Sequence, residues 1–211
     1  MHGKRHFNTA GDGQFHSGAF TSTTYQASGG LTLTTTISTP VTLAQWQELE
    51  IDLHAGIDTA KVRMWNSRAG YLWNDGRTLP VAPACGFKYP AGDEGARYAE
   101  QATIFGARNR VAVPAPPSLR TGQQSRLTIQ LFPDGRCGVA IDGIALGIAD
   151  ETATIAKPIR LLILGNSYKT KSLVGPLTLT RGVDTTIDWN TRRPPESPVT
   201  SPRTARTAPP D

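Results

Sequence analysis

The sequence predicts an all-β fold, an antiparallel sandwich of two sheets. Residues 126–132 alternate apolar and polar side chains with the period of a half-buried strand. Pro133-Asp134-Gly135 and Asp142-Gly143 separate this run from the next two apolar runs. Asp-Gly between alternating runs favours a tight hairpin, because glycine adopts the positive φ that the turn requires. Two further apolar runs follow at 159–164 and 173–179. Five short strands with turns between them indicate a β-meander within a sandwich.

The N-terminal half carries further strand candidates. Residues 31–37 place Leu31, Leu33 and Ile37 in alternation with threonines, with a further threonine at position 35, and β-branched residues suit a pleated surface. Gly29-Gly30 predicts a turn before this strand, and Pro40 ends it. The other predicted strands are 14–20, 21–27, 61–65, 102–105 and 110–113, with a turn at 114–117.

Residues 46–53, Trp-Gln-Glu-Leu-Glu-Ile-Asp-Leu, form the strand with the clearest two-faced pattern. Its leucines and isoleucine share one face, and Glu48, Glu50 and Asp52 share the other. Trp46 is out of phase with the apolar face, which predicts a bend or bulge that turns its ring into the core. Alternation alone makes the three carboxylates a solvent-facing acidic stripe.

Residues 66–101 are the longest region without periodicity, and long loops on a rigid scaffold often carry function. Sugars present apolar C–H faces that pack on flat aromatic rings with polar groups beside them. The sequence therefore predicts a glycan-binding platform made of Trp65, Tyr71, Trp73, Asn74 and Tyr89. In the alternative interpretation, Trp65 packs inward, and Phe87 and Tyr89 cover the edge of the sandwich.

The length of 211 residues fits one sandwich domain with appendages. We expect a flexible lead-in at 1–13, the sandwich at 14–189, and a disordered Pro/Thr/Arg-rich tail or linker at 190–211. The formal net charge is +5, of which +2 lies in this tail. Elsewhere no Lys/Arg cluster is interleaved with aromatic residues, so nucleic acid is not an expected partner. No apolar run approaches the ~20 residues of a membrane span, so membrane insertion is not expected either.

Cys85 and Cys137 are the only cysteines. As a bridge they would close a loop of about 50 residues and stabilise the fold by roughly 4 kcal/mol. Two buried free thiols are the alternative in a reducing compartment. The bridge is the favoured interpretation, and with it an extracytoplasmic or secreted location, although the chain as written shows no signal peptide.

Four stretches together resemble the concanavalin A-like lectin/glucanase superfamily, including its laminin-G-like jelly rolls. They are the tryptophan-led strand at 46–53, the hairpin at 131–143, the run 159–164 with Gly165-Asn166-Ser167 after it, and the closing strand 174–177 with Gly182. The resemblance spans roughly residues 14–189. It implies a jelly-roll β-sandwich with one concave sheet, in a superfamily of carbohydrate binders, glycoside hydrolases and adhesion or structural modules.

The same resemblance raises the question of catalysis. Its β-glucan hydrolases carry Glu-x-Asp-x-Glu, with the first Glu as nucleophile and the last as acid/base. Here Glu50-Ile51-Asp52 matches the first half, but the pattern then fails, because Leu53-His54-Ala55 supplies no carboxylate. A diverged hydrolase would use Glu48, Glu50 and Asp52, with alternate residues ~6.6 Å apart along the strand. The incomplete motif favours a protein that is not an enzyme.

Metal and cofactor signals are weak. The four histidines give no zinc spacing. Asp75, Asp93 and Glu94 are the candidates for a calcium site, although no Asp-x-Asp-x-Asp-Gly spacing is present, and solvated loop acids are the alternative. We expect a non-catalytic carbohydrate-binding module. The alternatives are a structural or adhesive domain with a cell-surface or protein partner, and a diverged glycoside hydrolase.

Overall fold

A computed structural model provides the structure of the protein. It describes residues 5–6, 17–21, 23–41, 49–56, 83–91, 99–165 and 172–190. In these ranges the regular structure is strand, apart from one four-residue helix, α3 (Pro117–Arg120). No helix within these ranges is long and apolar enough to cross a membrane.

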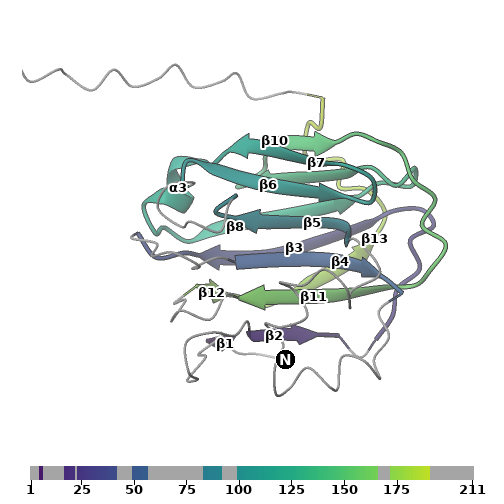
Figure 1. Ribbon diagram of the computed structural model, residues 1–211, viewed down its shortest axis with the longest axis horizontal. Coiled ribbons are helices and arrows are strands. Elements are labelled where there is room, and N and C mark those ends of the chain that lie inside the picture. The colour runs from purple at the N-terminus through teal and green to yellow at the C-terminus, as the bar shows by residue number, and fades with distance from the viewer. Residues whose placement is uncertain are drawn as a thin grey trace, which may run out of the picture.

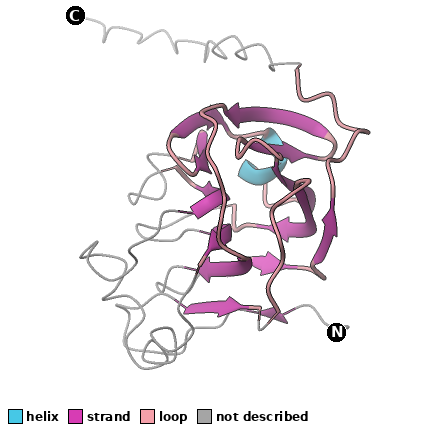
Figure 2. Ribbon diagram, turned by 90° about the vertical axis from the view of Figure 1, so that its right-hand side faces the viewer, coloured by secondary structure: helices cyan, strands magenta, loops and turns pink. Residues whose placement is uncertain are grey.

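The strands form two antiparallel sheets (Figures 1 and 2). In Figure 1 most of the labelled strands lie across the view, with their arrows pointing alternately left and right. The seven-stranded sheet has the order β1-β12-β3-β8-β9-β10, with β13 also paired to β3. Its strands are β1 (Arg5–His6), β3 (Leu31–Ser38), β8 (Ser125–Leu131), β9 (Cys137–Ile141), β10 (Ile144–Ala149), β12 (Leu173–Val174) and β13 (Thr178–Arg181).

The six-stranded sheet has the order β2-β11-β4-β5-β6-β7. Its strands are β2 (Ser17–Phe20), β4 (Leu49–Ala55), β5 (Pro83–Tyr89), β6 (Gln101–Gly106), β7 (Arg110–Pro114) and β11 (Ile159–Gly165). The predicted two-sheet antiparallel sandwich is therefore confirmed.

The predicted five-strand meander is wrong in its extent. β8, β9 and β10 are successive neighbours, and Asp142 and Gly143 between the last two have φ of 53° and 80°. β11, however, lies in the other sheet, and the run 173–179 is split into β12 and β13, which both pair with β3. Pro176 lies in the gap, where a missing N–H interrupts the ladder.

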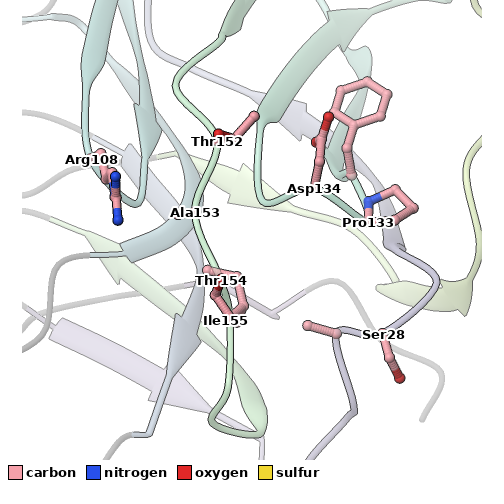
Figure 3. Close-up of a pocket in the computed structure, with 10 residues that line it drawn as sticks. Ser28, Arg108, Pro133, Asp134, Thr152, Ala153, Thr154 and Ile155 are labelled. Carbon is pink, nitrogen blue, oxygen red and sulfur yellow. The ribbon is translucent and has the colours of Figure 1, made fainter.

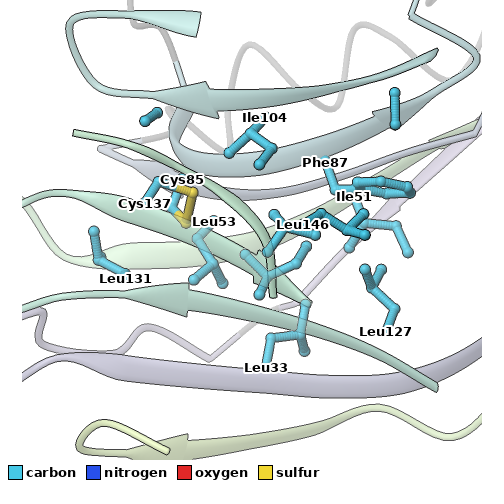
Figure 4. Close-up of a cluster of buried hydrophobic side chains, with 14 of the residues drawn as sticks. Leu33, Ile51, Leu53, Cys85, Phe87, Ile104, Leu127, Leu131, Cys137 and Leu146 are labelled. Atoms are coloured by element: carbon cyan, nitrogen blue, oxygen red, sulfur yellow. A yellow bond between two sulfur atoms is a disulfide. The ribbon is translucent and has the colours of Figure 1, made fainter. Parts of the chain in front are cut away.

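Apolar side chains of both sheets meet in one core (Figure 4). Leu33 and Leu127 come from the seven-stranded sheet, and Ile51 and Phe87 come from the six-stranded sheet; all four are fully buried. The predicted Cys85–Cys137 bridge is present and joins β5 to β9. It therefore links the two sheets through the middle of the core.

β5 corrects the expectation that 66–101 is irregular throughout. Residues 83–89 form a strand between β4 and β6. Phe87 and Tyr89 point into the core and are 0% and 1% exposed, and the Tyr89 hydroxyl donates to the Ala99 carbonyl at 3.0 Å. Tyr89 thus offers no exposed ring to a glycan, and the alternative that both rings cover the sandwich edge is wrong as well.

Residues 182–190 lie against the outer face of the seven-stranded sheet. The Asp184 amide donates to Gln130 Oε1 at 2.9 Å, and Thr32 Oγ1 donates to the same oxygen at 2.7 Å. Further along, the Trp189 ring meets the Phe132 ring edge-on, with centroids 5.5 Å apart. This segment fixes Phe132 beside the β8–β9 turn.

Candidate functional site

The outer face of β4 carries three ionisable side chains in a row. Because alternate residues of a strand share a face, Glu50, Asp52 and His54 point away from the core that Ile51 and Leu53 fill. Their exposed fractions are 1%, 0% and 1%. The expectation of a solvent-facing acidic stripe is therefore wrong for Glu50 and Asp52, since the second face of β4 is buried too.

The neighbouring strand β5 places a lysine and a glycine, which has no side chain, beside these residues. In the β4–β5 register Glu50 lies opposite Lys88, and Asp52 lies opposite Gly86. Lys88 is 7% exposed, and opposite charges on paired residues stabilise a sheet. On the next strand Thr103 lies opposite Lys88. The centre of the sheet's outer face thus holds two carboxyl groups, one ammonium group, one imidazole and one hydroxyl.

Asp52 and His54 leave hydrogen-bonding capacity unused. Neither oxygen of Asp52 and neither ring nitrogen of His54 has a hydrogen-bond partner in the described part of the chain. A buried polar atom without a partner costs about 1–3 kcal/mol, so such groups are uncommon outside functional sites. Four such atoms on one strand mark this face as the candidate site.

Burial changes the protonation of both side chains. It raises the pKa of Asp52 from 3.8 to about 7, while Glu50 and the positive charge of Lys88 act in the opposite direction. Glu50 lies near enough to affect this pKa without completing a hydrogen bond of ordinary geometry to Asp52. Burial lowers the pKa of His54 from 6.5 to about 4. At neutral pH the imidazole is therefore uncharged, and Asp52 holds a proton in a substantial fraction of molecules.

Gly86 makes room for the Asp52 carboxyl group. A Cβ at position 86 would overlap Asp52 Oδ1 and would lie 2.9 Å from its Cγ and 3.3 Å from the Ile51 carbonyl oxygen. We expect Gly86→Ala to displace the Asp52 side chain and lower the free energy of unfolding by about 1–3 kcal/mol, as overpacking does. Urea unfolding measures the loss. In an Asp52→Ala background the same substitution should cost much less, and an equal cost in both backgrounds would contradict the proposed clash.

Most residues predicted for a ligand or metal site lie outside the described ranges. These are Glu48, Trp65, Tyr71, Trp73, Asn74, Asp75, Asp93 and Glu94, so the aromatic platform and the calcium site stay predictions. Trp46, whose ring was expected to turn into the core, lies outside the described ranges as well. Within the described ranges no group of three or more His, Cys, Asp or Glu side chains is arranged to hold a metal ion.

Sequence reasoning missed four members of the outer-face site: His54, Gly86, Lys88 and Thr103. His54 continues the alternation of Glu50 and Asp52 by one step, and extending that period would have found it. Lys88 and Gly86 lie on the strand that was not predicted, so no sequence signal placed them opposite the carboxylates.

Comparison with solved structures identifies the fold as the concanavalin A-like jelly roll. A mutant form of the Emp46p carbohydrate recognition domain is similar with a TM-score of 0.51 and 12% identity, over 80% of this chain and 79% of that one. A SAP-like pentraxin from Limulus polyphemus has a TM-score of 0.50 and 12% identity, over 86% of this chain and 76% of that one. A Bacteroides ovatus GH16 protein from a mixed linkage glucan locus has a TM-score of 0.51 and 9% identity, over 78% of this chain and 74% of that one. At sequence identities this low, the structural similarity establishes the fold and leaves the activity open.

The likeness to a structure titled sialidase covers 79% of this chain but 14% of that one, so the chain spans a small part of that protein. No protein-family model and no curated protein sequence matches the chain.

Proposed function

We propose that the protein is a non-catalytic carbohydrate-binding module that acts outside the cytoplasm. The observation that carries the proposal is the set of buried, unpartnered polar atoms of Asp52 and His54 on the outer face of the six-stranded sheet. The fold supports it, since solved structures similar to this one include a carbohydrate recognition domain. The disulfide supports the location, because such bonds persist in oxidising compartments.

A saccharide fits the chemistry of this face. Each sugar hydroxyl can both donate and accept a hydrogen bond. It can donate to an Asp52 oxygen or to the unprotonated ring nitrogen of neutral His54, and it can accept from the protonated ring nitrogen of His54. Lys88 adds a donor beside them. The group is closed to solvent without ligand, so binding requires an opening step, and we expect association slower than the usual range of roughly 10⁵–10⁷ M⁻¹s⁻¹. The rings of Trp65, Tyr71 and Trp73 in the predicted platform would supply the stacking surface, with Asn74 as a polar group beside them.

A glycan array with and without calcium, followed by titration of the best oligosaccharide, tests the proposal. We expect saturable binding that Asp52→Ala weakens at least about tenfold, because a hydrogen bond to a charged or partly charged group is worth about 1.5–3 kcal/mol. Glu100→Gln, which alters an exposed carboxylate just before β6 that is not one of the buried outer-face residues, should leave binding unchanged. Trp73→Ala tests the platform, and a dependence on calcium would direct attention to Asp75, Asp93 and Glu94. A blank array together with self-association or capture of a protein partner would favour the structural or adhesive alternative.

A diverged glycoside hydrolase is the second candidate. The raised pKa of Asp52 beside Glu50 favours it, because glycosidases pair a carboxyl group that holds its proton at neutral pH with a second, ionised one. Against it, His54 occupies the acid/base position of the motif, and its lowered pKa keeps the imidazole neutral at pH 7, without the imidazolium proton that a general acid would give up. Hydrolysis of a β-glucan that Glu50→Gln abolishes would establish this alternative. Binding without hydrolysis would favour the module.

A further inference from the structure

A cavity separate from the outer-face site lies at the β8–β9 turn (Figure 3). Its volume is about 410 Å³, within the roughly 300–1,000 Å³ of small-molecule sites. Four separate stretches of the chain line it: Ala27-Ser28, Arg108, Phe132 to Asp134, and Thr152 to Ile155. It shares no residue with the site around Asp52.

The walls of this cavity are held in place by specific contacts. The Ala153 amide donates to the Asp134 carbonyl at 3.0 Å, which ties the stretch 152–155 to the turn. Gly135 has φ of 84° and lies directly under Ala153, where a Cβ would overlap the Ala153 carbonyl. The Phe132 and Trp189 rings form a T-shaped pair, and the Arg136 guanidinium lies 5.1 Å from the centroid of the Phe132 ring. The cavity is thus a preformed feature.

The charges around the cavity favour an anion. Asp134 is neutralised by Arg136, whose Nε donates to Asp134 Oδ2 at 2.7 Å and whose amide donates to Oδ1 at 3.2 Å. Arg108, by contrast, makes no hydrogen bond or ion pair with any residue that the structure describes. An exposed guanidinium that has no acidic partner among the described residues is a ready donor to a carboxylate or sulfate group.

The rest of the lining suits a sugar ring. Ala27, Phe132, Pro133 and Ile155 supply apolar surface, and Ser28, Thr152 and Thr154 supply hydroxyls. In Figure 3 the stretch from Thr152 to Ile155 runs between Arg108 on one side and Pro133 and Asp134 on the other. A saccharide has both an apolar C–H face and hydroxyl groups, and an acidic sugar adds the anion that Arg108 would take.

We propose that this cavity is a second binding site, specific for an anionic saccharide unit held by Arg108 and the hydroxyls of the 152–155 stretch. The site goes beyond the proposed function and does not depend on it. Carboxylated and sulfated sugars share the required chemistry, so the probes distinguish them.

The test titrates the full chain with a galacturonate trisaccharide, a sulfated galactose trisaccharide and neutral cellotriose, at about 50 mM NaCl to limit charge screening, with two-dimensional NMR of the amides. We expect one of the anionic sugars to bind at least about tenfold more tightly than cellotriose in this cavity, with shifts centred on Thr152, Ala153 and Thr154. Arg108→Ala should weaken that binding at least about tenfold, and Thr154→Val about threefold or more. Arg110→Ala removes the same charge from an exposed position outside the cavity and should change little.

Four results would overturn the proposal: no binding of either anionic sugar, equal binding of cellotriose in this cavity, an equal loss in the Arg108 and Arg110 variants, or equally tight binding of inorganic sulfate. Asp52→Ala separates the two sites. It should weaken glycan binding at the outer face at least about tenfold and leave the Arg108-dependent binding intact, so the failure of one site can be told from the failure of the other.

Discussion

Breaking the Cys85–Cys137 bridge is expected to lower the free energy of unfolding by about 4 kcal/mol, because the bridge closes a loop between residues 52 positions apart. Domains of this size are stable by roughly 5–15 kcal/mol in total, so the loss is a large share. Both cysteines are fully buried and lie on different sheets, so the bond restrains how the two layers separate. Urea unfolding with and without reductant measures the effect.

A Cys85→Ala/Cys137→Ala double variant is the control for this measurement. It removes the bond without leaving thiols that can re-oxidise, and it should match the reduced wild type to within the cost of two small cavities, about 1–2 kcal/mol. Reductant should then change nothing further in the double variant. A wild-type midpoint that does not move on confirmed reduction would contradict the expected contribution.

The sequence predicted well those strands whose signal, alternating side chains or a turn dipeptide, lies within one short stretch of the chain. β3 and β8 alternate cleanly, and the Asp142-Gly143 turn between β9 and β10 needs two residues with positive φ. β5 was missed because cysteine, glycine and proline dilute its composition, even though Cys85, Phe87 and Tyr89 keep the period of two. A central strand buried on both faces need not look like a half-buried one.

The candidate site shows a different limit. Alternation correctly placed Glu50 and Asp52 on one face of β4, but it cannot tell whether that face meets water. Burial is a property of everything that packs against the strand, and it decides whether a carboxyl group is an ordinary surface charge or one with a pKa of about 7. The cavity at Arg108 had no sequence signal at all, because four stretches distant in the chain create it.

Asp52 and His54 are expected to make the free energy of unfolding depend on pH in opposite directions. Replacing either residue should therefore reveal the pH dependence that the other one causes. The pKa of Asp52 is raised in the folded state, so its contribution to stability is present below about pH 4 and is lost as the pH rises towards about 7. The pKa of His54 is lowered, so its contribution is present above about pH 6.5 and is lost as the pH falls towards about 4. Between about pH 4 and 6.5, where both groups titrate, the two contributions to the free energy of unfolding change in opposite directions.

Wild-type stability should therefore vary little between about pH 4.5 and 7, and the single variants should not share this flat profile. In Asp52→Asn the histidine contribution remains, so acidification across that range should lower the free energy of unfolding by up to about 3 kcal/mol. In His54→Gln the aspartate contribution remains, and the same acidification should raise it by up to about 4 kcal/mol.

Urea unfolding at several pH values gives these slopes, which remain informative even if a substitution lowers stability at every pH. Parallel profiles for all three proteins would mean that these two groups are not buried as the structure has them. If the slopes diverge as expected, Asp52 and His54 are held uncharged in large part at neutral pH. That is the state in which they can share hydrogen bonds with a sugar hydroxyl.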